Sequence, residues 1–498
     1  MRCKISPFGL NDKVVSLNDE VVNRNDKVVS RNHEVVGRND KDDIIKWYFV
    51  LISTVFIVLL AVAISPSCAE IVTYRDVIRD ALNSSARVRV KVEDINISDA
   101  TYRQNFAGLY PEITANSRFE RHENLDKRPN QGLDTISGEV VGGDPSSWRS
   151  SIYLWGQYYF SHLYKKRYEA NYYERMRDVR VYECDTEVKK LLREVTDAFS
   201  AVSEGKIKLR YTSEILKRLQ DVLSLKKQAF ANGQVSYEDV LKAEADFASM
   251  EKENAAIRKE FKENIERLRS YTGKTYEDHV EIEVLVSDGK RALADLRRSI
   301  ENTPEYKARM RELEANKFKV KAAANNFLPD ISLYGRYDYY GSNVNNLDNS
   351  FSDIRETSYA VGIMISLPLF DGGTRKWERT RNMYEFRRQE ESIKAVMEEK
   401  FRDIKTLHAG YMELSKSLKN YRKLSDQYEK MVDIAKKAHG FGERSIMDIM
   451  EIEKDALTVM RDLKVTEHAM AAYEKRLVLE TDYNNFISEY YGHGTCKY

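Results

Sequence analysis

The sequence predicts a mainly α-helical protein with a small β part, in which long coiled-coil helices and a β-hairpin occur twice in tandem. The first observation is an internal repeat: residues 109–113 (LYPEI) return as 328–331 (LPDI), and residues 233–241 return as 442–450. Both landmarks recur in the same order after roughly 210 residues, which indicates a duplicated unit. The other two observations are short stretches of alternating polarity and long proline-free stretches with helical spacing, and both occur in each copy.

Residues 1–43 form an extension of heptapeptide repeats. The motif NDKVV or a close variant begins at Asn11, Asn18, Asn25 and Asn32. Its two valines are adjacent, whereas the apolar positions of a coiled-coil seam are separated. A functional tail and a start site assigned too early are the two alternatives, and we assign this extension neither structure nor function.

Residues 44–69 are expected to be a signal peptide. The run 47–64 is apolar apart from serine and threonine, and Ser67 and Ala69 suit the small-residue positions of a signal peptidase site. This pattern predicts cleavage after Ala69. The run is also long enough to remain as a membrane anchor. Lipidation of Cys68 is a further alternative, although the residues before it fit the lipoprotein recognition sequence poorly.

Each repeat has the same expected order of elements. The first repeat, 70–290, contains a helical stretch (73–105), a strand (113–120), an exposed loop (122–147), a strand (152–160) and a long helix (164–231). The second repeat, 291–485, contains a helical stretch (292–326), a strand (331–339), an exposed loop (342–357), a strand (359–367) and a coiled-coil helix (393–435). Residues 486–498 form a C-terminal tail.

Alternation of polarity identifies the strands. In 331–339, apolar, aromatic and glycine residues occupy the odd positions, while Ser332, Arg336 and Asp338 fall on the other face. A period of two is that of a strand with one apolar and one polar face. Residues 359–367 alternate in the same way. The polar, turn-rich sequences between the strands of each pair therefore predict two hairpins with exposed loops.

The helices after each hairpin are expected to be unusually long. No proline occurs between Pro145 and Pro304 or after Pro368, so both regions lack the strongest helix breaker. A helix over 164–231 would be about 100 Å long at about 1.5 Å per residue. In the second copy, apolar residues recur at an average step of about 3.5 residues, the period of a left-handed coiled coil. These residues are Ile393, Met397, Phe401, Ile404, Leu407, Tyr411, Leu414, Leu418, Tyr421, Leu424, Tyr428, Met431 and Ala435.

Composition and motifs argue against several classes of function. The chain is 32% charged with a net charge of +1, so no basic surface for nucleic acid is expected. No H-E-x-x-H motif occurs, and no nucleotide-binding glycine motif lies at a strand-to-helix junction. Cys184 and Cys496, the cysteines left after cleavage, lie far apart without metal-ligand spacing and add little to the prediction. We expect no catalytic site, no metal site and no cofactor; composition alone fits a structural coiled-coil protein.

Four short strands cannot close a membrane barrel within one chain. Single-chain barrels use at least about eight strands, and an open sheet edge in lipid leaves backbone groups unpaired. The expected strands approach the roughly 9 to 11 residues needed to cross an outer membrane at a tilt. Several chains must therefore share one barrel, with the long helices leaving it at one end.

The sequence resembles the TolC-like outer-membrane efflux proteins over about 71–485. FLPDISL at 327–333 resembles the family's entry into a hairpin, and LPLFDGG at 367–373 resembles its exit. NTPE at 302–305 resembles the turn near the start of each family repeat. The first copy departs from this pattern at 158–162, where YYFSH replaces the exit motif.

This resemblance implies a homotrimer with a twelve-stranded transmembrane β-barrel on an α-helical barrel, located in the outer membrane with its helices in the periplasm. Pro111, Pro329 and Pro368 would be the hairpin corners. The implied function is the duct of a tripartite efflux pump or type I secretion system, for passive export of small molecules or polypeptides. Implied partners are a periplasmic adaptor (membrane fusion) protein, an inner-membrane pump or ABC transporter, and outer-membrane lipid. The alternative is a periplasmic coiled-coil structural or adaptor protein without a channel.

The turns between the long helices have a sufficient local explanation. Each carries a glycine that can end a helix in the left-handed conformation, a serine that can cap the next helix, and an aspartate that approximates a capping box. These residues are Gly233, Ser236 and Asp239 in the first copy and Gly442, Ser445 and Asp448 in the second.

The resemblance implies that these turns form the gate of the channel. By position, Asp448 and Glu451 match the family's acidic ring at the periplasmic constriction. Arg444 matches a gate-linking arginine, and Asp239 matches its acidic partner on the other repeat. His439 stands where the best-known member has a linking tyrosine. Each of these charges also fits an ordinary solvated helix surface.

Overall fold

The computed structural model of the protein describes residues 71–123, 132–133, 140–141, 146–276, 281–287, 296–343, 346–492 and 496. The heptapeptide extension and the expected signal peptide lie outside the described residues. Within the described ranges, no helix has both the length and the apolar character needed to cross a membrane.

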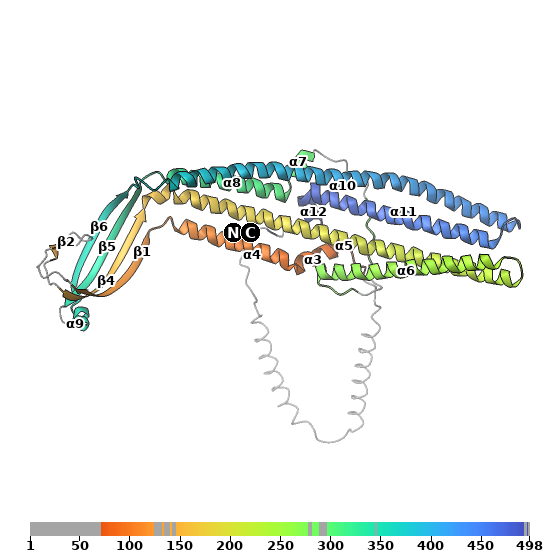
Figure 1. The fold of residues 1–498 in the computed structure, drawn as a ribbon, viewed down its shortest axis with the longest axis horizontal. Helices are drawn as coiled ribbons and strands as arrows, with labels where there is room; N and C mark the ends of the chain where they lie inside the picture. The colour runs from red at the N-terminus through yellow and green to blue at the C-terminus, as the bar shows by residue number, and fades with distance from the viewer. Residues whose placement is uncertain are drawn as a thin grey trace, which may run out of the picture. The chain divides into compact units, whose positions relative to one another are not determined.

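Both repeats contain the predicted helices and strands (Figure 1). The elements of the first are α3 (Tyr74–Ser84), α4 (Ala86–Ala107), β1 (Glu112–Glu123), β2 (Gly132–Leu133), β3 (Val140–Val141), β4 (Ser146–Tyr159), η1 (Phe160–Leu163), α5 (Lys166–Ala231) and α6 (Tyr237–Thr272). The elements of the second are α7 (Leu296–Glu301), α8 (Pro304–Asn325), β5 (Asp330–Asn343), α9 (Leu347–Ser352), β6 (Glu356–Ser366), α10 (Thr374–Gly440), α11 (Ile446–Thr481) and α12 (Tyr483–Tyr490).

The four long strands form one antiparallel sheet in the order β1-β4-β5-β6. The two predicted hairpins are confirmed: β1 pairs with β4, and β5 pairs with β6. Pairing of β4 with β5 joins the repeats, with Leu154 opposite Tyr337. This order leaves β1 and β6 as the edges of the sheet.

The two faces of the sheet differ as predicted. On β6, Tyr359, Val361 and Ile363 are 81%, 73% and 68% exposed, so an apolar row faces away from the rest of the chain. The opposite face carries polar contacts: Arg336 forms an ion pair with Asp338 at 2.6 Å. A sheet that exposes its apolar side chains needs a partner, or lipid, on that face.

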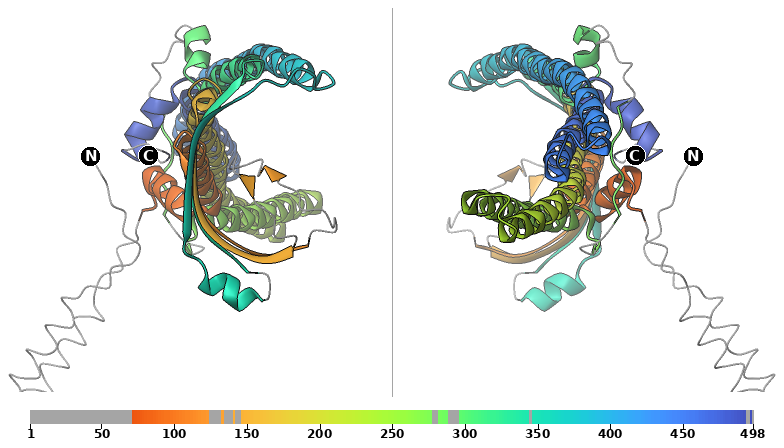
Figure 2. Two further views of the ribbon diagram at one scale, coloured as in Figure 1. Left: turned by 90° about the vertical axis from the view of Figure 1, so that its left-hand side faces the viewer. Right: turned by 90° about the vertical axis from the view of Figure 1, so that its right-hand side faces the viewer.

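The helices form a layer in which α5 packs against α4, α6, α8 and α11, while α10 packs against α8 and α11. Seen end-on in Figure 2, this layer is curved, with α10, coloured from teal to mid-blue, at one end and the green α6 at the other. The heptad prediction for α10 is confirmed in part. Ile404 and Leu418 are buried, but Phe401 and Met431 are each 46% exposed. They are exposed because α10 lies at the edge of the layer.

Buried apolar side chains form a core midway along the helices (Figure 1). It combines residues of α3, α4, α5, α6, α11 and α12 with the segment that follows α6. Cys184 of α5 and Cys496 are part of this core and form a disulfide of 2.06 Å. The expectation that these cysteines add little is therefore wrong. The two cysteines are 312 residues apart, so no local sequence pattern could indicate that they pair.

Candidate functional site

The first candidate site is the pair of turns that join the long helices. After α5, Gly233 adopts the left-handed conformation with φ of 72°. Ser236 then caps α6, because its Oγ accepts a hydrogen bond from the amide of Asp239 at 3.1 Å. The Asp239 carboxylate accepts in return from the Ser236 hydroxyl at 2.7 Å and from the Ser236 amide at 3.1 Å. These bonds lower the pKa of Asp239 and complete the predicted capping box.

The second turn differs from the first. Gly442 is again left-handed, with φ of 75°. Ser445, however, caps α11 by accepting from the amide of Met447 at 3.2 Å and not from that of Asp448. Among the described residues, Asp448 has no hydrogen-bond or ion-pair partner, and its side chain is exposed. The second turn therefore presents a free carboxylate where the first uses one for capping.

Glu451 lies one helical turn beyond Asp448, and it is also exposed. Its Oε1 lies 3.2 Å from Nζ of Lys226 on α5. Glu453 lies 2.8 Å from Lys436 of α10 and 3.4 Å from Arg218 of α5. Two carboxylates of α11 thus link the second repeat to the first near the turns, and the sequence prediction did not include their cationic partners.

The structure does not bring Arg444 and Asp239 together within one chain. The side chain of Arg444 has no ion pair among the described residues, whereas the Asp239 carboxylate is bonded to Ser236. His439 contacts the Arg444 backbone: its Nδ1 lies 2.7 Å from the Arg444 carbonyl oxygen and donates to it. A link from Arg444 to Asp239 of a neighbouring copy stays a prediction.

The three predicted hairpin corners lie where strands meet helices. Pro111 precedes β1, Pro329 precedes β5 and Pro368 follows β6. The Pro329 carbonyl accepts a hydrogen bond from the Tyr164 hydroxyl. The Pro368 carbonyl accepts from the Arg375 guanidinium at 2.7 Å. Both corners are therefore tied to the helices beside them.

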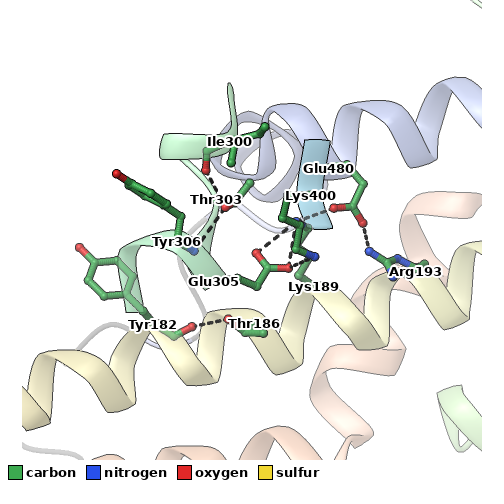
Figure 3. Close-up of polar contacts among 10 residues, drawn as sticks. All are labelled: Tyr182, Thr186, Lys189, Arg193, Ile300, Thr303, Glu305, Tyr306, Lys400 and Glu480. Carbon is green, nitrogen blue, oxygen red and sulfur yellow. Dashed lines mark hydrogen bonds and ion pairs between the residues drawn. The ribbon is translucent and has the colours of Figure 1, made fainter. Parts of the chain in front are cut away.

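The second candidate site is a buried ion network midway along the helices (Figure 3). Lys189 of α5 lies 2.7 Å from Glu480 of α11, and both side chains are 1% exposed. Glu305 of α8 lies 3.2 Å from Lys189 and 2.8 Å from Lys400 of α10. Arg193 of α5 also pairs with Glu480. This network connects the four helices α5, α8, α10 and α11, and hence both repeats.

The sequence around Glu305 explains how it reaches the network. Thr303 caps α8 by accepting from the amide of Tyr306, and Pro304 begins the helix. The NTPE motif thereby fixes the carboxylate in the first turn, where the two lysines converge (Figure 3). Burial alone would raise the pKa of Glu305, but Lys189 and Lys400 outweigh it and hold the pKa below its ordinary value.

Comparison with known proteins gives consistent similarities. A family model described as "Outer membrane efflux protein" matches residues 77–274 and 296–478. The outer membrane protein TolC of Salmonella enteritidis is 22% identical over 288 residues, covering 56% of this chain and 57% of that protein. TolC of Vibrio cholerae is 20% identical over 270 residues, covering 52% of this chain and 60% of that protein. The chain thus spans less than two thirds of each of these relatives.

Solved structures share the fold. The outer membrane protein VceC of Vibrio cholerae superposes with a TM-score of 0.67 at 18% identity, covering 81% of this chain and 95% of that one. The CmeC outer membrane channel of Campylobacter jejuni gives a TM-score of 0.67 at 15% identity, covering 83% and 88%. At these identities the likeness concerns the arrangement of helices and strands.

Proposed function

Because the chain belongs to the outer membrane efflux protein family, we propose that it is the outer-membrane duct of a tripartite efflux pump or type I secretion system. The observation that carries this proposal is the open four-stranded sheet, apolar on its outer face and continuous with a curved layer of long helices. Such a duct provides a passive path for small molecules or polypeptides.

The two free sheet edges support a homotrimer. In lipid, the backbone groups of β1 and β6 need partners, because no water is available to them. Pairing β6 of one copy with β1 of the next closes a barrel, and three copies give twelve strands, within the range of known outer-membrane barrels. The apolar row of β6 then faces outer-membrane lipid. The helices of the three copies continue the barrel into the periplasm.

The disulfide supports location outside the cytoplasm. Disulfides persist in oxidising compartments such as the bacterial periplasm and are rare in the cytosol. The bond between Cys184 and Cys496 therefore favours an exported chain. The alternative of a periplasmic structural or adaptor protein without a channel is less favoured, because the sheet would then expose its apolar face to water.

The turns between the long helices would form the periplasmic mouth. Three copies of Asp448 and Glu451 would form the constriction ring, while Arg444, Asp239 and His439 would link neighbouring helix pairs. A periplasmic adaptor and an inner-membrane pump or ABC transporter would dock here and supply the energy for transport. The exposed, unpaired carboxylate of Asp448 supports this assignment.

Single-channel conductance in planar bilayers, measured together with native mass in detergent, tests the proposal. We expect a trimer that conducts. A stable monomer without conductance would overturn the proposal. A periplasmic chain that binds a pump but does not conduct would favour the adaptor alternative.

A further inference from the structure

We propose that the C-terminal segment is a redox-closed strap that locks the two repeats together midway along the helices. The C-terminal strap, meaning α12 with Tyr491, Gly492 and Cys496, leaves the end of the second repeat and returns to the first. Its final described residue forms the disulfide with Cys184 of α5. The loop closed by this bond contains the whole second repeat.

The strap docks on the first repeat through apolar contacts. Phe486 is fully buried, and Tyr483 and Ile487 are 6% and 5% exposed. The ring of Tyr490 meets that of Tyr74 of α3 edge-on at 5.2 Å. These residues belong to the same core as Cys184, so the disulfide secures a surface that is already complementary.

Polar contacts extend the docking to both sides. The Tyr491 hydroxyl donates to Asn83 Oδ1 at 3.0 Å, and Arg75 donates to the Glu489 carbonyl at 3.2 Å. The Tyr483 hydroxyl donates at 3.4 Å to Asp185, the neighbour of Cys184. The strap therefore connects the first helix of the described chain to its last.

The position of the cysteines sets the order of events. Cys496 follows Cys184 by 312 residues, so the bond can close only after the second repeat between them has been exported. The sequence contains no other cysteine between these two positions, so no third thiol competes for the bond within the loop that it closes. Closure of the strap thus follows export of the second repeat.

The chemistry requires a disulfide-bearing oxidant of the periplasm. The thiolate of Cys496 attacks the oxidant's disulfide to give a mixed disulfide and one free oxidant thiol. The thiolate of Cys184 then attacks the Cys496 sulfur and releases the second oxidant thiol. The two cysteines together lose two electrons and two protons, and the oxidant becomes a dithiol.

Closure also protects the ion network. Lys189 lies on α5 just beyond Cys184, and Glu480 lies on α11 just before α12. Release of the strap would let water reach the Lys189–Glu480 pair and would separate the end of the second repeat from α3. The bond itself is shielded, because Cys184 and Cys496 are 0% and 3% exposed. Reduction of the native protein therefore requires the strap to open first.

The first test measures thiols and dynamics in the protein purified from its own membrane. Maleimide labelling under denaturing conditions, with peptide mapping, should find no free thiol at Cys184 or Cys496 until a reductant is added. Hydrogen exchange should be about tenfold or more faster across α12 in Cys496→Ser and in Cys184→Ser than in wild type. Exchange at Gly233 and Gly442 should be unchanged.

Two controls keep the test decisive. Tyr491→Phe removes one strap hydrogen bond and keeps the disulfide, so its α12 should exchange nearly as slowly as in wild type. Reduced wild-type protein should match Cys496→Ser, which covers the case of a variant that fails to fold. Free thiols in the membrane-derived chain would overturn the proposal, and so would equal α12 exchange with and without the bond.

The inference rests on the proposed export, but its outcome is separable from that of the duct. A trimer that conducts but carries free thiols would overturn the strap proposal and support the duct proposal. A protein that contains the disulfide but does not conduct would overturn the duct proposal and support the strap proposal.

Discussion

Lys189 and Glu480 form a 2.7 Å ion pair across the two repeats, and almost none of either side chain reaches solvent. Lys189 also contacts Glu305, but Lys400 shares that carboxylate, so removing Glu480 leaves buried positive charge without enough carboxylates to balance it. Glu480→Gln should therefore lower the free energy of unfolding by about 3 to 5 kcal/mol. Thermal unfolding of the solubilised protein measures this loss. Lys394→Met, which breaks an exposed pair with Glu391, is the control and should leave the midpoint unchanged.

Glu305 should make the free energy of unfolding depend on pH. Its pKa in the folded protein lies below the ordinary value of 4.5, so the folded state binds fewer protons than the unfolded state. The resulting stabilisation is complete above that ordinary value and is lost as pH falls through the folded pKa. As pH falls below about 5, wild type should lose stability more steeply than Glu305→Gln. Parallel profiles for the two proteins would contradict this assignment.

Arginine placed on the two faces of β6 should have unequal effects. Val361→Arg would put a charge toward lipid, which costs about 2 to 4 kcal/mol near the midplane, and should reduce the yield of membrane-inserted protein. Ser366→Arg lies on the other face, opposite Asp330, and should be tolerated. Gly362 is unsuitable as a control, because a Cβ there would lie 2.6 Å from the Tyr334 hydroxyl. Equal yields from both variants would mean that the faces are misassigned.

Neutralising the proposed ring should weaken cation binding at the mouth. Three copies of Asp448 and Glu451 would focus negative potential in a narrow passage. The double variant Asp448→Asn with Glu451→Gln should show weaker block by divalent cations than wild type, measured as single-channel current against cation concentration. Lys226→Met, which removes the cationic partner of Glu451, should strengthen the block or leave it unchanged. Identical block in all three proteins would assign these residues to ordinary helix surface.

The proposed gate link can be separated from helix capping. Asp239→Asn keeps an oxygen that can accept from Ser236 but removes the charge, whereas Asp239→Ala removes both. If Arg444 binds this charge in a neighbouring copy, Asp239→Asn and Arg444→Ser should each raise the conductance. Their combination should add little, because both break one interaction. A rise in conductance with Asp239→Ala alone would instead trace the effect to loss of the cap.

Local patterns predicted the strands, the long helices and the turn glycines, because each depends on residues close in sequence. Cys184 and Cys496 could not be paired in this way, since the fold alone brings them together. The ion network was missed for a similar reason. Lys189 is one lysine among many on a charged helix. Its burial depends on α8, α10 and α11 packing around the same level of α5. The NTPE motif marked the position of Glu305 without indicating its two partners.

The free edges β1 and β6 have a genetic consequence if three copies share one barrel. Each copy then offers one edge to each neighbour, so one defective edge breaks a closure that involves all three chains. When altered and normal genes are expressed together, most mixed assemblies contain at least one altered copy. Mutations that damage an edge should therefore be dominant, whereas mutations that only prevent export of the chain should be recessive.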